Sequence, residues 1–113
     1  MAKVFITGVA GFLGSHLADL MIANGHTVAG NDNMIGGYTD NVPQDVEFHQ
    51  VDCCDLENLT KAMEGCDIVY HTAATAYEGL SVFSPVLVTR NIFEASVTTI
   101  TAAIRNKVKR IVY

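Results

Sequence analysis

Three glycines after a short apolar run near the N-terminus limit most strongly what this chain can fold into. Residues 3–7 (Lys-Val-Phe-Ile-Thr) are typical of a buried strand, and Gly8, Gly11 and Gly14 follow at equal spacing before a helix-period pattern. In this strand-to-helix context, Gly8 allows a tight turn, Gly11 lets a phosphate approach the backbone, and Gly14 lets helix and strand pack closely. The free N–H groups at the start of the helix would then face the pyrophosphate of a dinucleotide.

Strands and helices alternate along the rest of the chain, without an internal repeat or a low-complexity segment. Hydrophobic periodicity and turn residues predict strands over 3–7, 27–31, 46–51, 68–71 and 110–113. They also predict helices over 11–24, 55–64 and 85–106, and a surface loop over 33–44. This alternation is typical of an α/β fold, here a doubly wound parallel sheet of the Rossmann type with strand order 3-2-1-4-5. The ligand crevice of such a sheet opens where strands one and four diverge.

Local signals predict how the helices begin and end. Asp55 is expected to cap the second helix, and Ser84 to cap the third, with Pro85 at its first helical position. Asn24 and Gly25 end the first helix, because glycine commonly follows a helix C-terminus. The apolar positions of the first helix predict one buried face made of Leu13, Leu17, Leu20 and Met21.

Length and composition exclude several classes of protein. The 113 residues, half of them apolar, suffice for one domain with a single core, and they contain no apolar run long enough to span a membrane. A net charge of -5 disfavours nucleic acid as a general partner. Cys53, Cys54 and Cys66 are an odd number without metal-ligand spacing, so we expect free thiols in a reducing compartment and a cytoplasmic location.

Asp32 ends the predicted second strand, 24 residues after Gly8. An acidic residue at this place accepts hydrogen bonds from the adenosine ribose hydroxyls of a dinucleotide. Its carboxylate also repels a 2′-phosphate, and neither Arg nor Lys occurs between positions 31 and 44, so NAD is favoured over NADP. The Asn-Asp-Asn sequence at 31–33 is also typical of a turn, which leaves a purely structural role open for Asp32.

The ends of the third and fourth strands carry further candidate residues. Asp52 and Cys53 would lie beside the adenine; alternatively, Asp52 starts a turn and Cys53 packs in the core. The small residues at 72–74 allow a pyrophosphate and a nicotinamide ribose to approach, although tight packing without a ligand would also explain them. The histidines are expected to be structural, since none lies at metal-ligand spacing from another ligand: His16, His26, His49 and His71.

Together these segments resemble the extended short-chain dehydrogenase/reductase family, typified by nucleotide-sugar epimerases and dehydratases. The resemblance spans the chain and rests on Thr-Gly-x-x-Gly-Phe-x-Gly-Ser-His-Leu at 7–17, Asp-Asn at 32–33, Val-Asp at 51–52, His-Thr-Ala-Ala at 71–74 and Val-Lys-Arg-Ile-Val-Tyr at 108–113. It implies an NAD cofactor, transient hydride transfer to NAD and a nucleotide-sugar substrate. By this resemblance, the pyrophosphate would contact Gly8, Gly11, Phe12 and Leu13. The adenosine ribose would contact Asp32 and Asn33, and the adenine would contact Asp52 and Cys53. The path to the nicotinamide would be lined by Thr72, Ala73, Ala74 and Ala76.

The sequence departs from the family pattern in two places. Catalysis in the family uses a Tyr-x-x-x-Lys pair, and no tyrosine of this chain has a lysine four residues later. The resemblance therefore predicts no catalytic residue here, and an N-terminal portion of a longer enzyme, truncated after the fifth strand. The family also often has an asparagine on the long helix near the cofactor. Counting back from Val108 places Ile92 at that position, with Asn91 one residue early.

Two other functions stay open at this point. The chain could be a non-catalytic module that senses a dinucleotide, or part of an oxidoreductase of the same family that acts on a steroid or flavonoid. The related enzymes often dimerise through the long helix, so a homodimer is a further expectation. Small residues on one face of this helix would allow such a contact, or equally its packing on its own sheet: Ala95, Ser96, Thr99 and Ala103.

Overall fold

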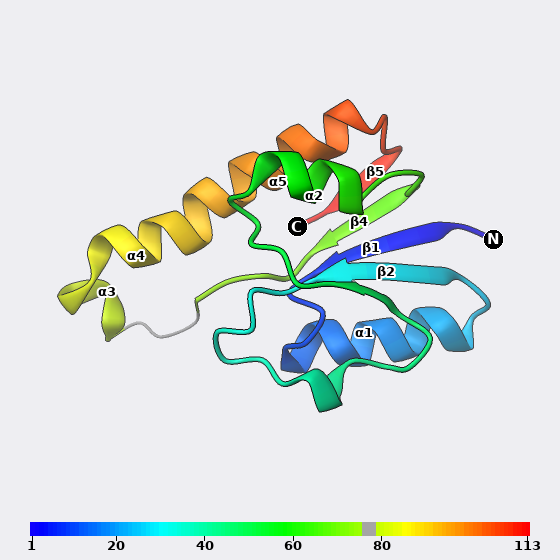
Figure 1. Ribbon diagram of the computed structural model, residues 1–113, viewed down its shortest axis with the longest axis horizontal. Coiled ribbons are helices and arrows are strands. Elements are labelled where there is room, and N and C mark those ends of the chain that lie inside the picture. Colours follow the sequence, from blue (N-terminus) through cyan, green and yellow to red (C-terminus); the bar gives the residue numbers. More distant parts are fainter. Residues whose placement is uncertain (76–78) are drawn as a thin grey trace.

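The computed structural model describes residues 1–75 and 79–113 and shows an open parallel sheet with helices on both faces (Figure 1). The strand order is β3-β2-β1-β4-β5, and every neighbouring pair of strands is parallel. This order confirms the α/β fold and the topology expected from the sequence. The strands are β1 (Lys3–Thr7), β2 (Thr27–Asn31), β3 (Glu47–His49), β4 (Ile68–His71) and β5 (Arg110–Val112).

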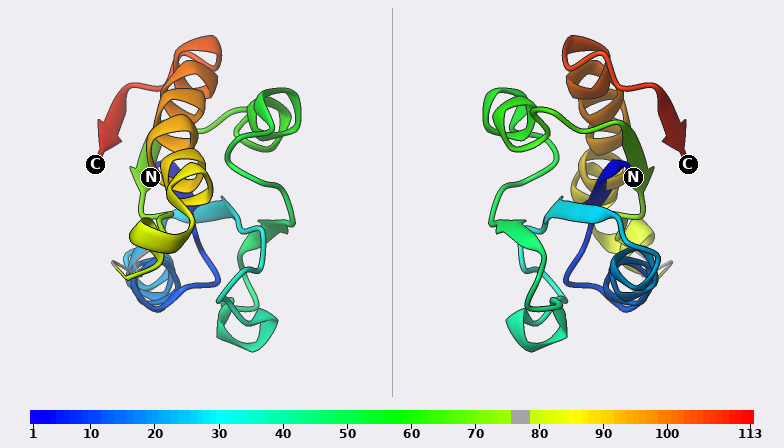
Figure 2. Two further views of the ribbon diagram at one scale, coloured as in Figure 1. Left: turned by 90° about the vertical axis from the view of Figure 1, so that its left-hand side faces the viewer. Right: turned by 90° about the vertical axis from the view of Figure 1, so that its right-hand side faces the viewer.

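The helices form two layers, with α1 on one face of the sheet and α2 and α5 on the other, as the end-on views of Figure 2 show. Within the described ranges, no helix is long and apolar enough to cross a membrane. The helices are α1 (Phe12–Ala23), α2 (Leu56–Ala62), α3 (Leu80–Phe83), α4 (Pro85–Thr89) and α5 (Ala95–Arg105), with a 3-10 turn η1 (Thr39–Asn41) and a π-helical turn η2 (Arg90–Glu94).

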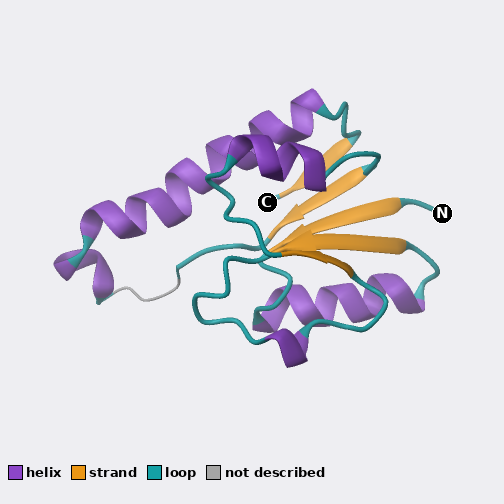
Figure 3. Ribbon diagram, viewed as in Figure 1, coloured by secondary structure: helices purple, strands orange, loops and turns teal. Residues whose placement is uncertain are grey.

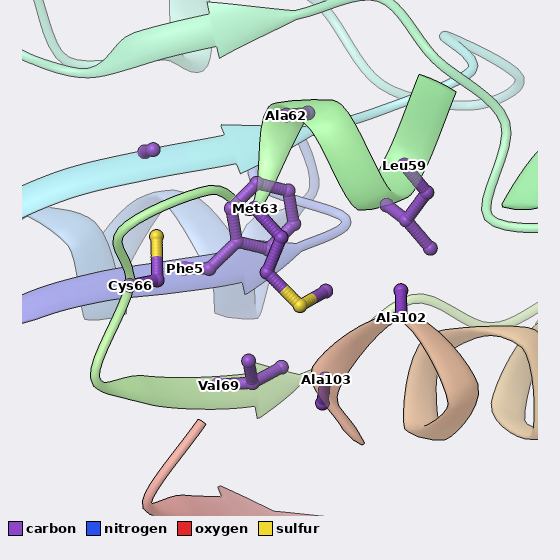
Figure 4. Packing of buried hydrophobic residues seen from close by; sticks show 9 residues of the cluster. Phe5, Leu59, Ala62, Met63, Cys66, Val69, Ala102 and Ala103 are labelled. Atoms are coloured by element: carbon purple, nitrogen blue, oxygen red, sulfur yellow. The ribbon is translucent and has the colours of Figure 1, made fainter. Parts of the chain in front are cut away.

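Side chains of β1 alternate between two hydrophobic clusters, one on each face of the sheet. Phe5 packs with Leu59 of α2, with Met63 directly after α2, and with the small side chains Ala102 and Ala103 of α5 (Figure 4). On the opposite face, Val4 and Ile6 pack in a cluster with Val9, Ala18 and Val28. Burial on both faces is what requires the nearly continuous apolar run of a central parallel strand.

The long helix predicted over 85–106 is present, but it contains a π-helical turn that the sequence did not predict. Figure 3 shows α4, η2 and α5 as one continuous helix. A π-turn accommodates one extra residue within an α-helix. Ser84 holds the N-cap position with Pro85 following it, as expected, yet the Ser84 side chain makes no capping hydrogen bond. The short helix α3, just before it, was not predicted either.

The buried face predicted for the first helix is only partly correct. Leu17 and Met21 pack against the core, but Leu13 and Leu20 are 64% and 55% exposed. The buried positions of α1 are the small residues Gly14, Ser15 and Ala18. At Gly14 a larger side chain does not fit, because a Cβ there would lie 2.2 Å from the Gly8 carbonyl oxygen.

Other boundaries differ from the sequence expectation by short lengths. The strand predicted over 46–51 is reduced to β3, because turns close at each end of it: the Val46 N–H donates to the Pro43 carbonyl and the Val51 N–H to the His49 carbonyl. The predicted loop over 33–44 contains η1. Asp55 caps α2 as expected, accepting from the Asn58 N–H at 3.3 Å.

Truncating Leu59 should destabilise the protein strongly. Its side chain, on α2, is fully buried in the cluster with α5 and the sheet, so Leu59→Ala leaves a cavity and should lower the free energy of unfolding by about 2–5 kcal/mol. The matched control is Leu20→Ala, because the Leu20 side chain of α1 is largely exposed. Its free energy of unfolding should change by no more than about 0.5 kcal/mol. Urea denaturation followed by circular dichroism measures both, and equal effects would contradict the described packing.

Candidate functional site

The glycine turn joins β1 to α1 at the carboxyl end of the sheet. Gly8 has a left-handed backbone with φ of +70°, and the N–H groups of Gly8 and Val9 both donate to the Asn31 carbonyl at the end of β2. A Cβ placed on Gly14 would lie 2.2 Å from the Gly8 carbonyl oxygen, and one on Gly8 would lie 2.9 Å from the Cα of Ala73. Gly8 and Gly14 therefore have the turn and close-packing geometry expected of them.

The start of α1 offers backbone donors to the space above the turn. Gly11 is the N-cap of α1, its own N–H donates to the Gly8 carbonyl, and no side chain of the described residues caps the helix. The first N–H groups of a helix have no partner within the helix, and the helix dipole makes that end attractive to anions. The turn is thus built to face a phosphate.

A cavity of about 370 Å³ opens at this edge of the sheet. Except for Ala76, which lies outside the described residues, every residue expected to contact a dinucleotide lines it, from four different strand ends. They are Gly8, Gly11, Phe12, Leu13, Asp32, Asn33, Asp52, Cys53, Thr72, Ala73 and Ala74.

Asp32 lies just after β2 and is almost completely buried. Its carboxylate accepts from the Ala10 N–H at 3.1 Å and from the Met34 N–H at 2.8 Å. Asp32 therefore has the structural role in a turn that the sequence left open, and it also connects the glycine turn to the end of β2. An ionised carboxylate has about four acceptor sites, so two protein donors leave capacity for a ligand hydroxyl.

Asp52 and Cys53 have the structural roles that the sequence left open for them, and both also line the cavity. Asp52 starts a turn by accepting from the Cys54 N–H at 2.7 Å, and its second oxygen lies 3.5 Å from the Asn33 amide nitrogen. Cys53 is buried, and the Asn31 amide donates to its sulfur at 3.3 Å. Burial raises the pKa of the Cys53 thiol, so it stays protonated at neutral pH and forms an inert wall of the cavity.

The segment after β4 is fastened to the end of β1 through Thr7. The Thr7 hydroxyl accepts from the N–H groups of Thr72 and Ala73 at 3.0 and 3.1 Å, and the Thr72 hydroxyl donates to the Thr7 carbonyl. Ala73 lies directly against Gly8. Ala73 therefore packs tightly, and all three residues at 72–74 line the cavity.

One part of the cavity wall was not predicted from the sequence. The loop of Ile35, Gly36 and Gly37 lies over the glycine turn, with Gly37 close to Ala10. No periodic signal identifies such a loop. Its glycines and its position directly after Asp32 were the available hints.

The helix wall of the cavity consists of Asn91 and Ala95. Asn91 belongs to the π-turn, and its amide donates to the Thr75 hydroxyl at 3.0 Å. Ile92, the position obtained by counting back from Val108, does not line the cavity. The offset of one residue between Asn91 and the expected position 92 was the available sign of the π-turn, because a π-turn accommodates one extra residue within a helix.

Within residues 1–75 and 79–113, no group of three or more His, Cys, Asp or Glu side chains could hold a metal ion. All three cysteines are free. His16 is exposed beside the Phe12 ring, and His49 pairs with Glu47 at 3.0 Å, which agrees with structural roles.

Comparisons with known proteins agree on one family. Residues 4–113 match the model of the NAD-dependent epimerase/dehydratase family. The chain is 31% identical over 124 residues to a probable UDP-arabinose 4-epimerase of Arabidopsis thaliana, covering 100% of this chain and 30% of that protein.

Solved structures of epimerases have the same fold. The UDP-glucose 4-epimerase of Thermus thermophilus in complex with NAD superposes with a TM-score of 0.93 at 34% identity, covering 98% of this chain and 36% of that one. The UDP-glucose 4-epimerase of Thermotoga maritima with UDP-glucose gives 0.93 at 29% identity, covering 96% and 36%. The chain thus spans about a third of the length of these proteins.

Adding a methyl group at Gly14 should displace the turn. Because the new Cβ would overlap the Gly8 carbonyl, Gly14→Ala should lower the free energy of unfolding by about 1–3 kcal/mol or more. Gly79→Ala is the matched control, since a Cβ there meets nothing within 4 Å and the backbone is right-handed helical. Thermal unfolding of the two variants should separate them clearly. Equal stability would mean that α1 does not lie this close to the turn.

Proposed function

Because the chain belongs to the NAD-dependent epimerase/dehydratase family, we propose that it is the NAD-binding part of a nucleotide-sugar epimerase or dehydratase. One observation carries this proposal: the residues that the family resemblance assigns to NAD line one cavity over the glycine turn. Epimerases with the same fold bind NAD in one case and UDP-glucose in another. Because the chain covers only about a third of such proteins, the activity of the whole protein is part of the proposal.

The chain would hold NAD in an extended form across the strand ends. The N–H groups at the start of α1 would receive the pyrophosphate above Gly8 and Gly11, with Phe12 and Leu13 beside it. Asp32 would accept hydrogen bonds from the adenosine ribose, and Asn33 would donate to it. Asp52 and Cys53 would border the adenine. The nicotinamide half would follow the segment after β4, namely Thr72, Ala73, Ala74 and, outside the described residues, Ala76.

Charge in the cavity favours NAD over NADP. Among the described residues that line it, the charged side chains are the carboxylates of Asp32 and Asp52. A 2′-phosphate on the adenosine ribose would meet Asp32 without a cation beside it. The ribose hydroxyls of NAD, in contrast, can donate to that carboxylate.

The reaction itself requires groups that these 113 residues do not supply. Bound NAD supplies a hydride acceptor, and the family's Tyr-x-x-x-Lys pair, which moves the hydroxyl proton of the substrate, does not occur in this sequence. We therefore propose that this portion binds and orients the cofactor, and that the acid–base pair and the sugar-nucleotide pocket belong to the remainder of the enzyme. A cytoplasmic location and a homodimer are part of the same proposal.

Removal of the Asp32 carboxylate should weaken NAD binding and reduce discrimination against NADP. In Asp32→Ala, isothermal titration should show NAD affinity reduced by about tenfold or more, from the lost charge-assisted hydrogen bonds. The ratio of the NADP and NAD dissociation constants should also fall. This ratio is the decisive readout, because Asp32 also fastens the glycine turn and its loss alone would weaken both cofactors equally.

The matched control is Asp40→Ala, which removes an exposed carboxylate from the loop after β2. It should leave both affinities within a factor of about two. Equal affinity of the unaltered protein for NAD and NADP, or a preference for NADP, would overturn the assignment of NAD.

The purified 113-residue protein should bind NAD without turnover. Incubation with NAD and UDP-glucose should yield neither NADH absorbance nor a converted sugar nucleotide by chromatography, because no Tyr-x-x-x-Lys pair is present. A full-length enzyme of the family serves as the positive control. Conversion of the sugar nucleotide by these residues alone would refute the proposal that the acid–base pair belongs to the remainder of the enzyme.

A further inference from the structure

A continuous chain of hydrogen bonds connects the end of β1 to the helix wall of the cavity. The Thr7 hydroxyl lies 2.7 Å from Nδ1 of His71, and Nε2 of His71 lies 3.0 Å from the Ser96 hydroxyl. Ser96 in turn donates to the carbonyl of Ile92, within the π-turn, at 2.7 Å. Ile92 and Ser96 each directly follow a cavity-lining residue, Asn91 and Ala95.

The hydrogen bonds of Thr7 determine which ring nitrogen of His71 carries no proton. A hydroxyl oxygen has two lone pairs and one proton. Both lone pairs of Thr7 are used by the N–H groups of Thr72 and Ala73. The single Thr7 proton therefore points to Nδ1 of His71, which must accept it and cannot itself carry a proton.

The Ser96 end independently requires the same tautomer. The Ile92 carbonyl can only accept, so the Ser96 proton is directed to it. The Ser96 oxygen can then only accept from His71, and Nε2 must be the protonated nitrogen. Donors and acceptors match along the whole chain, from Thr7 through His71 and Ser96 to Ile92, for one form of the imidazole.

We propose that His71, neutral and protonated on Nε2, is a positioning residue that holds the helix wall of the dinucleotide cavity against the ends of β1 and β4. This inference rests on the proposed NAD-binding function, which it extends to a residue that does not line the cavity. His71 acts through Ser96 on the π-turn, and the π-turn places Asn91 beside Thr75 at the cavity.

The arrangement makes the cavity sensitive to pH. A doubly protonated His71 would direct an N–H from Nδ1 at a Thr7 oxygen whose lone pairs are already occupied. Around His71, Thr7 of β1 and Ser96 of α5 are uncharged, and among the described residues the Tyr113 ring, after β5, lies beside it with ring centroids 5.8 Å apart.

Burial lowers the pKa of His71 below its ordinary value of 6.5. The neutral form is therefore the one favoured by folding. Its contribution to stability is complete above pH 6.5 and decreases as the pH falls from 6.5 through the lowered pKa. The hydrogen-bond chain, and with it the affinity of the folded protein for NAD, should be lost as the pH falls through that lowered pKa.

The tautomer can be tested without any ligand or variant. Long-range proton–nitrogen correlation spectra of the unaltered protein at about pH 7.5 should identify His71 as the neutral Nε2–H form. Acidification should shift the amide signals of Asn91 to Ser96 together with the His71 ring. A neutral Nδ1–H form, or a His71 titration that leaves these amides unmoved, would overturn the proposal even if the protein bound no NAD.

Three substitutions separate hydrogen bonding from packing. His71→Gln keeps a donor that reaches Ser96, His71→Asn keeps only an acceptor for Thr7, and His71→Phe keeps the ring shape without either bond. At about pH 8, NAD affinity should stay within about threefold of the unaltered protein in His71→Gln and fall about three- to tenfold in the other two. A purely space-filling role would instead make His71→Phe the mildest change.

The pH profile of binding provides the second readout. Between about pH 8 and pH 5, NAD affinity of the unaltered protein should decline, whereas that of His71→Gln should stay nearly constant. His49→Gln, which removes a surface histidine away from the cavity, should keep the decline. The proposal is wrong if His71→Gln declines like the unaltered protein. Failure of the unaltered protein to bind NAD at all would count against the proposed function and not against the hydrogen-bond chain.

Discussion

The close approach of α1 to the turn after β1 is the constraint on which the rest of the structure depends. A helix whose Gly14 lies against the Gly8 carbonyl can begin directly above the strand ends, with its first N–H groups facing the cavity. Two hydrogen bonds to the Asn31 carbonyl attach the same turn to β2. Asp32, one residue later, attaches it again through Ala10. The glycine turn and the end of β2, which border the cavity, are therefore held in place by one set of contacts.

A second set of contacts fixes the opposite side of the cavity. Thr7 holds the segment after β4 by its side chain and its carbonyl, and His71 continues from Thr7 to the long helix. Few of these side chains face the cavity directly. The site is thus formed largely by backbone and small side chains, while the larger polar side chains behind them hold the strand ends at the correct spacing.

The sheet order, most strand positions and the cavity-lining residues at the strand ends could be predicted because they depend on local patterns. Apolar runs define the strands, and residues at the ends of parallel strands meet at one edge. The exposed Leu13 and Leu20 could not be predicted in this way, because helical periodicity does not register how closely Gly14 approaches Gly8. The π-turn was equally hidden. Its Asn91 side chain bonds to Thr75 after β4, a tertiary contact that local patterns do not register, and only the offset of Asn91 indicated the π-turn.

We propose that NAD lies across the carboxyl ends of the strands with its pyrophosphate on the glycine turn. Amide chemical shifts of the nitrogen-labelled protein, recorded during titration with NAD, test this placement residue by residue. The largest changes should fall on the amides of 8–13, 32–33, 52–54 and 72–75, the segments at the strand ends around the cavity. Changes spread over the surface, or confined to the outer face of the long helix, would contradict it.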